Sequence, residues 1–130
     1  MDYAQNLVKK LFADLPSKPR AVQGQWSQIR LSPDLTSGEQ LAVGVFLVVE
    51  DKVHSRFITD FSRIECAYDL SMVECFKFCI ELIEFALEQG HRSSLSPQII
   101  IDHRGYFQGD SVSEVLDHLM SVAVPLSRAK

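Results

Sequence analysis

The feature that most constrains the fold is a nearly unbroken apolar segment from Leu41 to Val49. Apolar residues occupy both alternating faces of this segment, which is typical of a strand that is covered on both sides. Gly44 lies in its middle and predicts a bulge or a close approach of another backbone, for a packing reason rather than for a ligand. The sequence therefore predicts a central strand here.

Three shorter strand patterns accompany the central one. The segment Trp26 to Leu31 is predicted as a first strand, and the turn-rich residues Ser32 to Gly38 lead from it into the central strand. After a short polar turn, the alternation in Val53 to Thr59 predicts a hairpin into a third strand. Gln98 to Asp102 is predicted as a fourth strand, closed by Arg104-Gly105 and Gln108-Gly109.

Apolar residues at helical spacing predict helices between and around these strands. An amphipathic first helix is expected from Tyr3 to Leu15, and a short helix from Phe61 to Tyr68. The last helix is expected to begin at Ser111, which has capping-box spacing with Glu114, and to end before Pro125.

The longest helix is expected to begin at Asp69 or Ser71 and to end at Gln89, before Gly90. Ser71 and Glu74 have capping-box spacing, in which each side chain can satisfy a free backbone N–H of the other residue. This helix is the second strong structural signal in the chain.

The polar residues of the longest helix form one narrow stripe, which consists of Glu74, Lys77, Glu81, Glu84 and Glu88. The rest of its circumference is largely apolar, which is more than a helix lying on one sheet face needs. Either the first and last helices of the chain cover the surplus, or another protein chain does. For the second case, the candidate partner-binding residues are Val73, Phe78, Leu82 and Phe85.

The predicted order is α-β-β-β-α-β-α, which indicates an α+β fold with a mostly antiparallel sheet of about four strands and helices packed on the sheet. A chain of 130 residues with 46% hydrophobic residues can bury one substantial core. We expect a single domain over residues 1–125 and a loose tail over residues 126–130.

The charge balance argues against nucleic acid and membrane partners. The formal net charge is -4, and the basic residues near the N-terminus are best explained as the solvated face of a helix; these are Lys9, Lys10, Lys18 and Arg20. No apolar run approaches the ~20 residues that cross a bilayer, and no secretory signal is visible. We expect a cytoplasmic location.

Cys66, Cys75 and Cys79 are best explained as buried, reduced thiols, because two of them lie within the apolar pattern of the longest helix. A zinc site would need further sulfur or imidazole ligands at recognisable spacing. The sequence contains no cofactor-binding or metal-binding pattern.

No catalytic motif is present. An enzyme would have to assemble its site from charged residues near the predicted strand ends, namely Arg30, Glu39, Asp60, Arg63 and Asp102. Asp102, His103 and Arg104 are consecutive, but neighbouring residues of a strand point to opposite faces, so Asp102 and His103 share a site only if the chain turns there. Paired surface charges and a polar strand exit explain these residues better.

Several segments resemble a bacterial family known as domain of unknown function three thousand and thirty-seven. They are Ile29 to Asp34, Gly38 to Leu47, Ser94 to Pro97 and Asp110 to Leu119, and the resemblance spans about Trp26 to Val124. Ala42 stands where that family has an asparagine. The resemblance implies a small accessory protein without an established activity, of a kind sometimes encoded near HipA-like kinases.

Three classes of function follow from these observations. The preferred hypothesis is a non-catalytic interaction protein, an accessory, inhibitor or antitoxin-like subunit of a bacterial or phage system that binds a protein partner or another copy of itself. The alternative is a small hydrolase-like enzyme, favoured if Glu39, Asp60 and Asp102 converge in one cleft. A nucleic-acid-binding module is the third and needs a localised basic surface.

Overall fold

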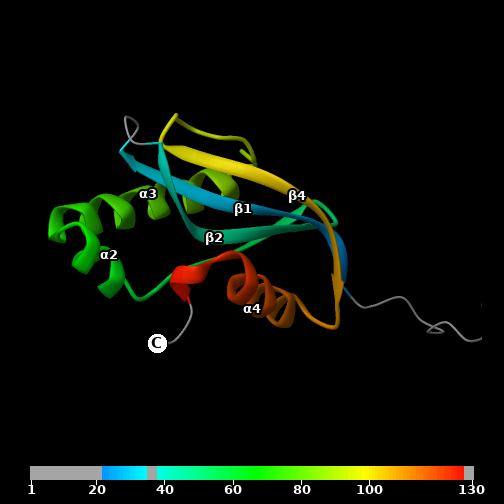
Figure 1. Ribbon diagram of the computed structural model, residues 1–130. Coiled ribbons are helices and arrows are strands. Elements are labelled where there is room, and N and C mark those ends of the chain that lie inside the picture. Colours follow the sequence, from blue (N-terminus) through cyan, green and yellow to red (C-terminus); the bar gives the residue numbers. More distant parts are fainter. Residues whose placement is uncertain (1–21, 35–37, 128–130) are drawn as a thin grey trace, which may run out of the picture.

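The protein folds around one four-stranded antiparallel sheet with strand order β3-β2-β1-β4 (Figure 1). The computed structural model describes residues 22–34 and 38–127. The strands are β1 (Val22–Asp34), β2 (Glu39–Val49), β3 (Lys52–Phe57) and β4 (Ile99–Gly109). This arrangement confirms the predicted α+β fold, whereas the helix predicted over Tyr3 to Leu15 and the basic residues near it lie outside the described residues.

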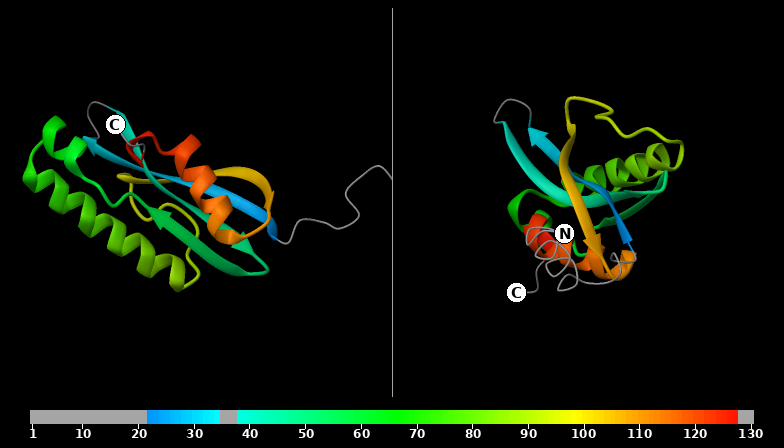
Figure 2. Two further views of the ribbon diagram at one scale, coloured as in Figure 1. Left: turned by 90° about the horizontal axis from the view of Figure 1, so that it is seen from below. Right: turned by 90° about the vertical axis from the view of Figure 1, so that its right-hand side faces the viewer.

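Helices cover both faces of the sheet (Figure 2). They are α2 (Ser62–Ala67), α3 (Leu70–Glu88) and α4 (Val112–Ala123), followed by the 3-10 helix η1 (Pro125–Ser127). The face of β1 that carries Gln28 lies against α4, because the Gln28 amide donates a hydrogen bond to the Ala123 carbonyl. The opposite face lies toward α3. All residues of β2 from Val43 to Leu47 are buried, which confirms the predicted central strand.

Gly44 is required where β2 approaches β3. A β carbon at this position would lie 2.6 Å from the Arg56 carbonyl oxygen and from a ring carbon of Phe57. The pairing with β1 also shifts by one residue at Val43, since Ile29 pairs with Gly44 and Arg30 pairs with Ala42. The predicted bulge and the predicted close approach are therefore both present.

The fourth strand is longer than the predicted segment Gln98 to Asp102, and it ends at the second of the two predicted closing pairs, Gln108-Gly109, not at the first. β4 continues through Gly105, whose φ is +135°, to Gly109. A register shift accommodates this continuation, because Ser27 pairs with His103 while Trp26 pairs with Gly105, which leaves Arg104 as an extra residue. The polar residues that suggested a strand exit instead form a bulge within a longer strand.

Of the two predicted starts of α3, Asp69 and Ser71, the structure selects Asp69, so the capping box of Ser71 is not formed. The N-cap is Asp69, whose Oδ1 accepts hydrogen bonds from the Met72 N–H and the Ser71 hydroxyl, both at 2.8 Å. At the other end Gly90 has a φ of +88°, and the His91 N–H donates to the Ala86 carbonyl at 2.9 Å. This is the Schellman arrangement expected of a glycine after a helix.

The stability of the folded protein is expected to depend on pH through the Asp69 cap of α3. The backbone hydrogen bond from Met72, followed by the Ser71 hydroxyl, lowers the pKa of Asp69 from 3.8. A carboxylate with a lowered pKa stabilises the folded state above its unfolded pKa, and this contribution is lost as pH falls through the folded pKa. Asp69→Asn keeps a cap oxygen but removes the charge, so the variant should be less stable than the native protein near neutral pH, and the difference should disappear well below pH 3.8. Melting temperatures of the two proteins at both pH values test this expectation, and a difference that persists in acid would contradict it.

Leu126 and Ser127, which we expected to belong to a loose tail, make defined contacts, and the rest of the expected tail lies outside the described residues. Leu126 packs against the core, and the Ser127 hydroxyl donates to the Met120 and Val124 carbonyls at 2.8 and 2.7 Å. These two carbonyls also accept hydrogen bonds from the Val124 and Ser127 N–H groups, so the Ser127 hydroxyl adds to the backbone contacts that hold η1 at the end of α4. The described part of the chain has one continuous hydrophobic core.

Candidate functional site

A polar cluster lies on the sheet face that α4 covers. Asp102 of β4 is flanked by two guanidinium groups, since its Oδ2 lies 3.2 Å from Arg104 Nε and 3.5 Å from a terminal nitrogen of Arg30. A terminal nitrogen of Arg104 donates to the Gln28 side-chain oxygen at 2.8 Å. The Gln28 amide nitrogen in turn donates to the Ala123 carbonyl at 2.6 Å. The cluster thus connects β4, β1 and the end of α4.

Strand alternation explains which sequence candidates meet in this cluster. Gln28 and Arg30 are two residues apart on β1 and share one face, and Asp102 is the cross-strand partner of Gln28. His103 points to the other face, where its Nδ1 lies 2.7 Å from the Ser27 hydroxyl. The expectation that Asp102 and His103 do not share a site is therefore confirmed.

The other charged candidates lie elsewhere. Asp60 accepts a hydrogen bond from the Ser62 N–H at 2.9 Å at the start of α2, and Arg63 donates to the Pro125 carbonyl at 3.2 Å. Glu39 is exposed at the first position of β2. Asp60 and Asp102 line different parts of the molecule, so the three carboxylates that an enzyme was expected to bring together do not converge.

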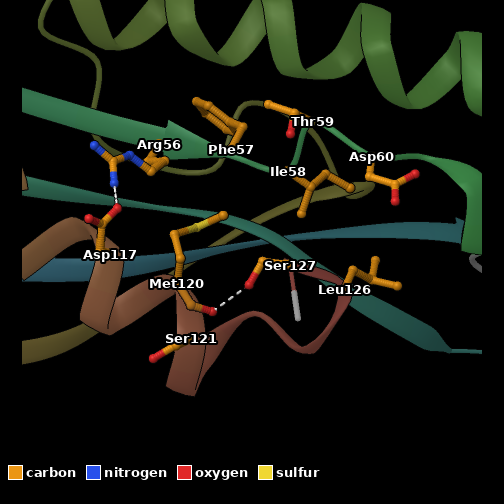
Figure 3. A pocket seen from close by; sticks show the side chains of 10 residues that line it. All are labelled: Arg56, Phe57, Ile58, Thr59, Asp60, Asp117, Met120, Ser121, Leu126 and Ser127. Atoms are coloured by element: carbon orange, nitrogen blue, oxygen red, sulfur yellow. Dashed lines mark hydrogen bonds and ion pairs between the residues drawn. The ribbon is translucent and has the colours of Figure 1, made fainter. Parts of the chain in front are cut away.

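Asp60 lines a cavity that is separate from the polar cluster and lies between the end of β3, α4 and η1 (Figure 3). Ile58, Met120 and Leu126 form its apolar part, and an ion pair between Arg56 and Asp117 bounds one side. The hydroxyl groups of its two serines donate to backbone carbonyls. Ser121 bonds to His118 and Ser127 bonds to Met120, so neither serine is held by a general base. This cavity can accept an apolar group, and neither of its serines is paired with a base.

The third candidate surface is the outer face of α3. Phe78, Leu82 and Phe85 are 66%, 42% and 61% exposed. Val73 is buried in the core, so its inclusion among the partner-binding residues is wrong. Val73 occupies a different side of the helix from the other three candidates, because it lies with Phe76 and Ile80 on the side that faces the sheet.

The expectation that all three cysteines are buried is wrong. All three thiols are free, but Cys66 and Cys75 are exposed and only Cys79 is partly buried. Burial, followed by the neighbouring Cys75 thiol, raises the pKa of Cys79. Among the described residues, no group of three or more His, Cys, Asp or Glu side chains is placed to hold a metal ion.

The described part of the chain covers the outer face of α3 less than we expected of the chain as a whole. α4, one of the two helices proposed to cover it, packs on the opposite face of the sheet. The other is the predicted first helix, which lies outside the described residues. In the part of the chain that the structure describes, the outer face of α3 remains an exposed apolar surface.

Within residues 22–34 and 38–127, no helix is both long enough and apolar enough to cross a membrane.

Sequence reasoning missed Gln28, which belongs to the polar cluster, and Trp26, which lines the same groove. Period-two alternation places both on the same face of β1 as Arg30. A buried polar residue within a strand was the available signal, but it could not be recognised without knowing which face α4 covers.

No protein-family model matches the chain, and no curated protein or solved structure matches it either. The resemblance to domain of unknown function three thousand and thirty-seven stays a prediction based on the sequence segments given above.

Proposed function

We propose that this protein is a non-catalytic interaction protein that binds a protein partner through the outer face of α3. The observation that carries the proposal is the exposure of an apolar row on the side of α3 away from the sheet. This row, the outer stripe, consists of Cys75, Phe78, Leu82 and Phe85. Its members are three and four residues apart, which is the spacing of a seam between two helices.

The energetics favour an occupied outer stripe. Burying a phenylalanine is worth about 1.5–3 kcal/mol relative to leaving it in water. Phe78 and Phe85 lie two turns apart, so one partner helix can cover both of them. Exposed aromatic residues at such spacing are typical anchors of helix-in-groove and helix-pair recognition.

The charges beside the outer stripe indicate the chemistry of the partner. The flanking charged row contains four glutamates and one lysine: Glu74, Lys77, Glu81, Glu84 and Glu88. The Lys77 ammonium lies 5.4 Å from the centre of the Phe61 ring and so is directed toward that ring. A partner helix that has an apolar ridge beside a row of lysine or arginine residues is complementary to this surface.

A second copy of the same helix is less suitable, because it would bring four more glutamates to the contact. Nucleic acid is also disfavoured, since the sequence contains 13 Lys and Arg against 17 Asp and Glu and has a formal net charge of -4. Together with the sequence resemblance, these features support an accessory, inhibitor or antitoxin-like subunit of a bacterial or phage system. The small hydrolase-like enzyme has no observation in its favour.

The test is affinity capture of the tagged full-length protein from its native host, in parallel with the double variant Phe78→Asp and Phe85→Asp. The control is Tyr106→Asp, which removes a similarly exposed aromatic side chain from β4. We expect a stoichiometric partner with a basic amphipathic helix, bound by the native protein and the control. The double variant should bind it at least about 100-fold more weakly, because two aromatic anchors are lost. Raising the salt concentration should weaken binding of the native protein.

Three results would contradict this proposal. Retention of the partner by the double variant would place the interface elsewhere. A dimeric mass of the native protein that the double variant reduces to a monomer would identify a second copy as the occupant. Faster thiol labelling of Cys75 after Leu11→Asp, in the absence of a partner, would identify the N-terminal segment of the same chain as the cover.

A further inference from the structure

We propose that the groove beside the Arg30 and Arg104 guanidinium groups binds a small organic anion, a carboxylate carried on an apolar body. The groove has a volume of about 600 Å³, within the range of ligand sites, and lies between β1, β2 and the end of α4. Gln28, Arg30, Gln40 and Arg104 form its polar side, and Trp26 also lines it. This inference does not depend on the interaction proposed for α3.

The groove has an excess of positive charge. One oxygen of Asp102 serves both guanidinium groups, so two positive charges share a single negative one. Arg30 Nε is buried and has no hydrogen-bond partner among the described residues. The two arginine side chains are 28% and 42% exposed, so a ligand in the groove can reach both of them. The exposed parts of the two planar guanidinium groups favour a carboxylate that accepts two hydrogen bonds.

The site is held in place before a ligand arrives. Gln28 is only 7% exposed, and both ends of its amide are used, one by Arg104 and the other by the Ala123 carbonyl. The second bond occupies a carbonyl at the C-terminal end of α4, which would otherwise repel an anion. The β4 bulge leaves Arg104 as the unpaired residue between His103 and Gly105, and the bond to Gln28 fixes its guanidinium on the groove side.

The apolar residues that line the groove indicate the chemistry of the ligand beyond its carboxylate. Leu41, Val122 and Leu126 supply apolar surface beside the guanidinium groups, and the Trp26 side chain lies on the same face of β1 as Arg30. Val122 is exposed although it is apolar. An aliphatic body that extends from the carboxylate would cover this surface.

Trp26 provides a direct measurement, because it is the single tryptophan of the chain. The experiment is a fluorescence titration of the full-length protein with hexanoate, hexanol and inorganic phosphate. We expect a saturable change with hexanoate, and binding at least ten times weaker for hexanol and for phosphate. Arg104→Gln and Arg30→Gln should each weaken hexanoate binding at least tenfold, and Arg104→Lys should cause an intermediate loss because it keeps the charge but not the planar fork.

Lys52→Gln is the matched control, since it removes one positive charge from an exposed position on β3 and should leave binding unchanged. Circular dichroism establishes that each variant is folded. No saturable change with hexanoate, or equal binding by folded Arg104→Gln, would overturn the proposal. Phosphate binding tighter than hexanoate would overturn the carboxylate assignment, and equal binding of hexanol would overturn the role of the guanidinium groups.

Discussion

Replacing Phe76 by alanine is expected to lower the free energy of unfolding by about 3–5 kcal/mol. Phe76 is 1% exposed and lies on the side of α3 that faces the sheet. The substitution removes the aromatic contacts and leaves a cavity that a closely packed interior can fill only partly. Since small domains are stable by only about 5–15 kcal/mol, the loss should shift the urea midpoint strongly.

Phe78→Ala is the matched control, two residues further along the same helix. Its side chain is exposed, so the truncation should change the free energy of unfolding by less than about 0.5 kcal/mol. Equilibrium urea unfolding, followed by circular dichroism, measures both variants. A loss for Phe78→Ala that approaches the loss for Phe76→Ala would mean that the same chain buries the outer stripe, contrary to the proposed partner site.

Gly44→Asn is expected to cost about 1–3 kcal/mol through overpacking in the middle of the sheet. The new β carbon would lie 2.6 Å from the backbone carbonyl oxygen of Arg56 and would also meet the Phe57 ring. A carbonyl within a paired strand cannot move without loss of its ladder hydrogen bonds. β2 and β3 would therefore have to separate locally, and the melting temperature should fall.

Gly90→Asn is the control for this prediction. Gly90 has a φ of +88°, but nothing lies within 4 Å of a β carbon placed there. Asparagine tolerates this left-handed conformation better than other residues with a side chain, so the loss should stay below about 1 kcal/mol. Thermal unfolding of the two variants separates the causes. If Gly90→Asn proved at least as destabilising as Gly44→Asn, backbone strain and not steric contact would be the dominant effect.

The two proposed binding surfaces can be tested independently, because they lie on opposite sides of the sheet. The outer stripe is on the far side of α3, whereas the groove with Arg30 and Arg104 lies beside the end of α4. Mutations at Phe78 and Phe85 should leave hexanoate binding unchanged, and Arg104→Gln should leave partner capture unchanged. Additivity of distant substitutions supports this expectation.

The order of the described elements follows from local patterns in the sequence. Period-two alternation and a two-sided apolar run predicted the strands, and the Ser111 cap of α4 and the Gly90 end of α3 were found as expected. These features depend on residues a few positions apart, so a single chain is sufficient to recognise them. The choice between Asp69 and Ser71 as the cap of α3 was left open because both residue types can accept the same hydrogen bond.

Tertiary structure decided which faces of these elements are buried and where the sites lie. An almost wholly apolar helix has no unique buried side in its sequence, so Val73 and Phe78 became distinguishable only when the sheet was in place beside α3. The β4 bulge depends on pairing with Trp26 and Ser27, which are more than seventy residues away in the chain. The groove of Gln28, Arg30 and Arg104 depends on that bulge and on α4, because its hydrogen bonds join segments that only the folded sheet brings together.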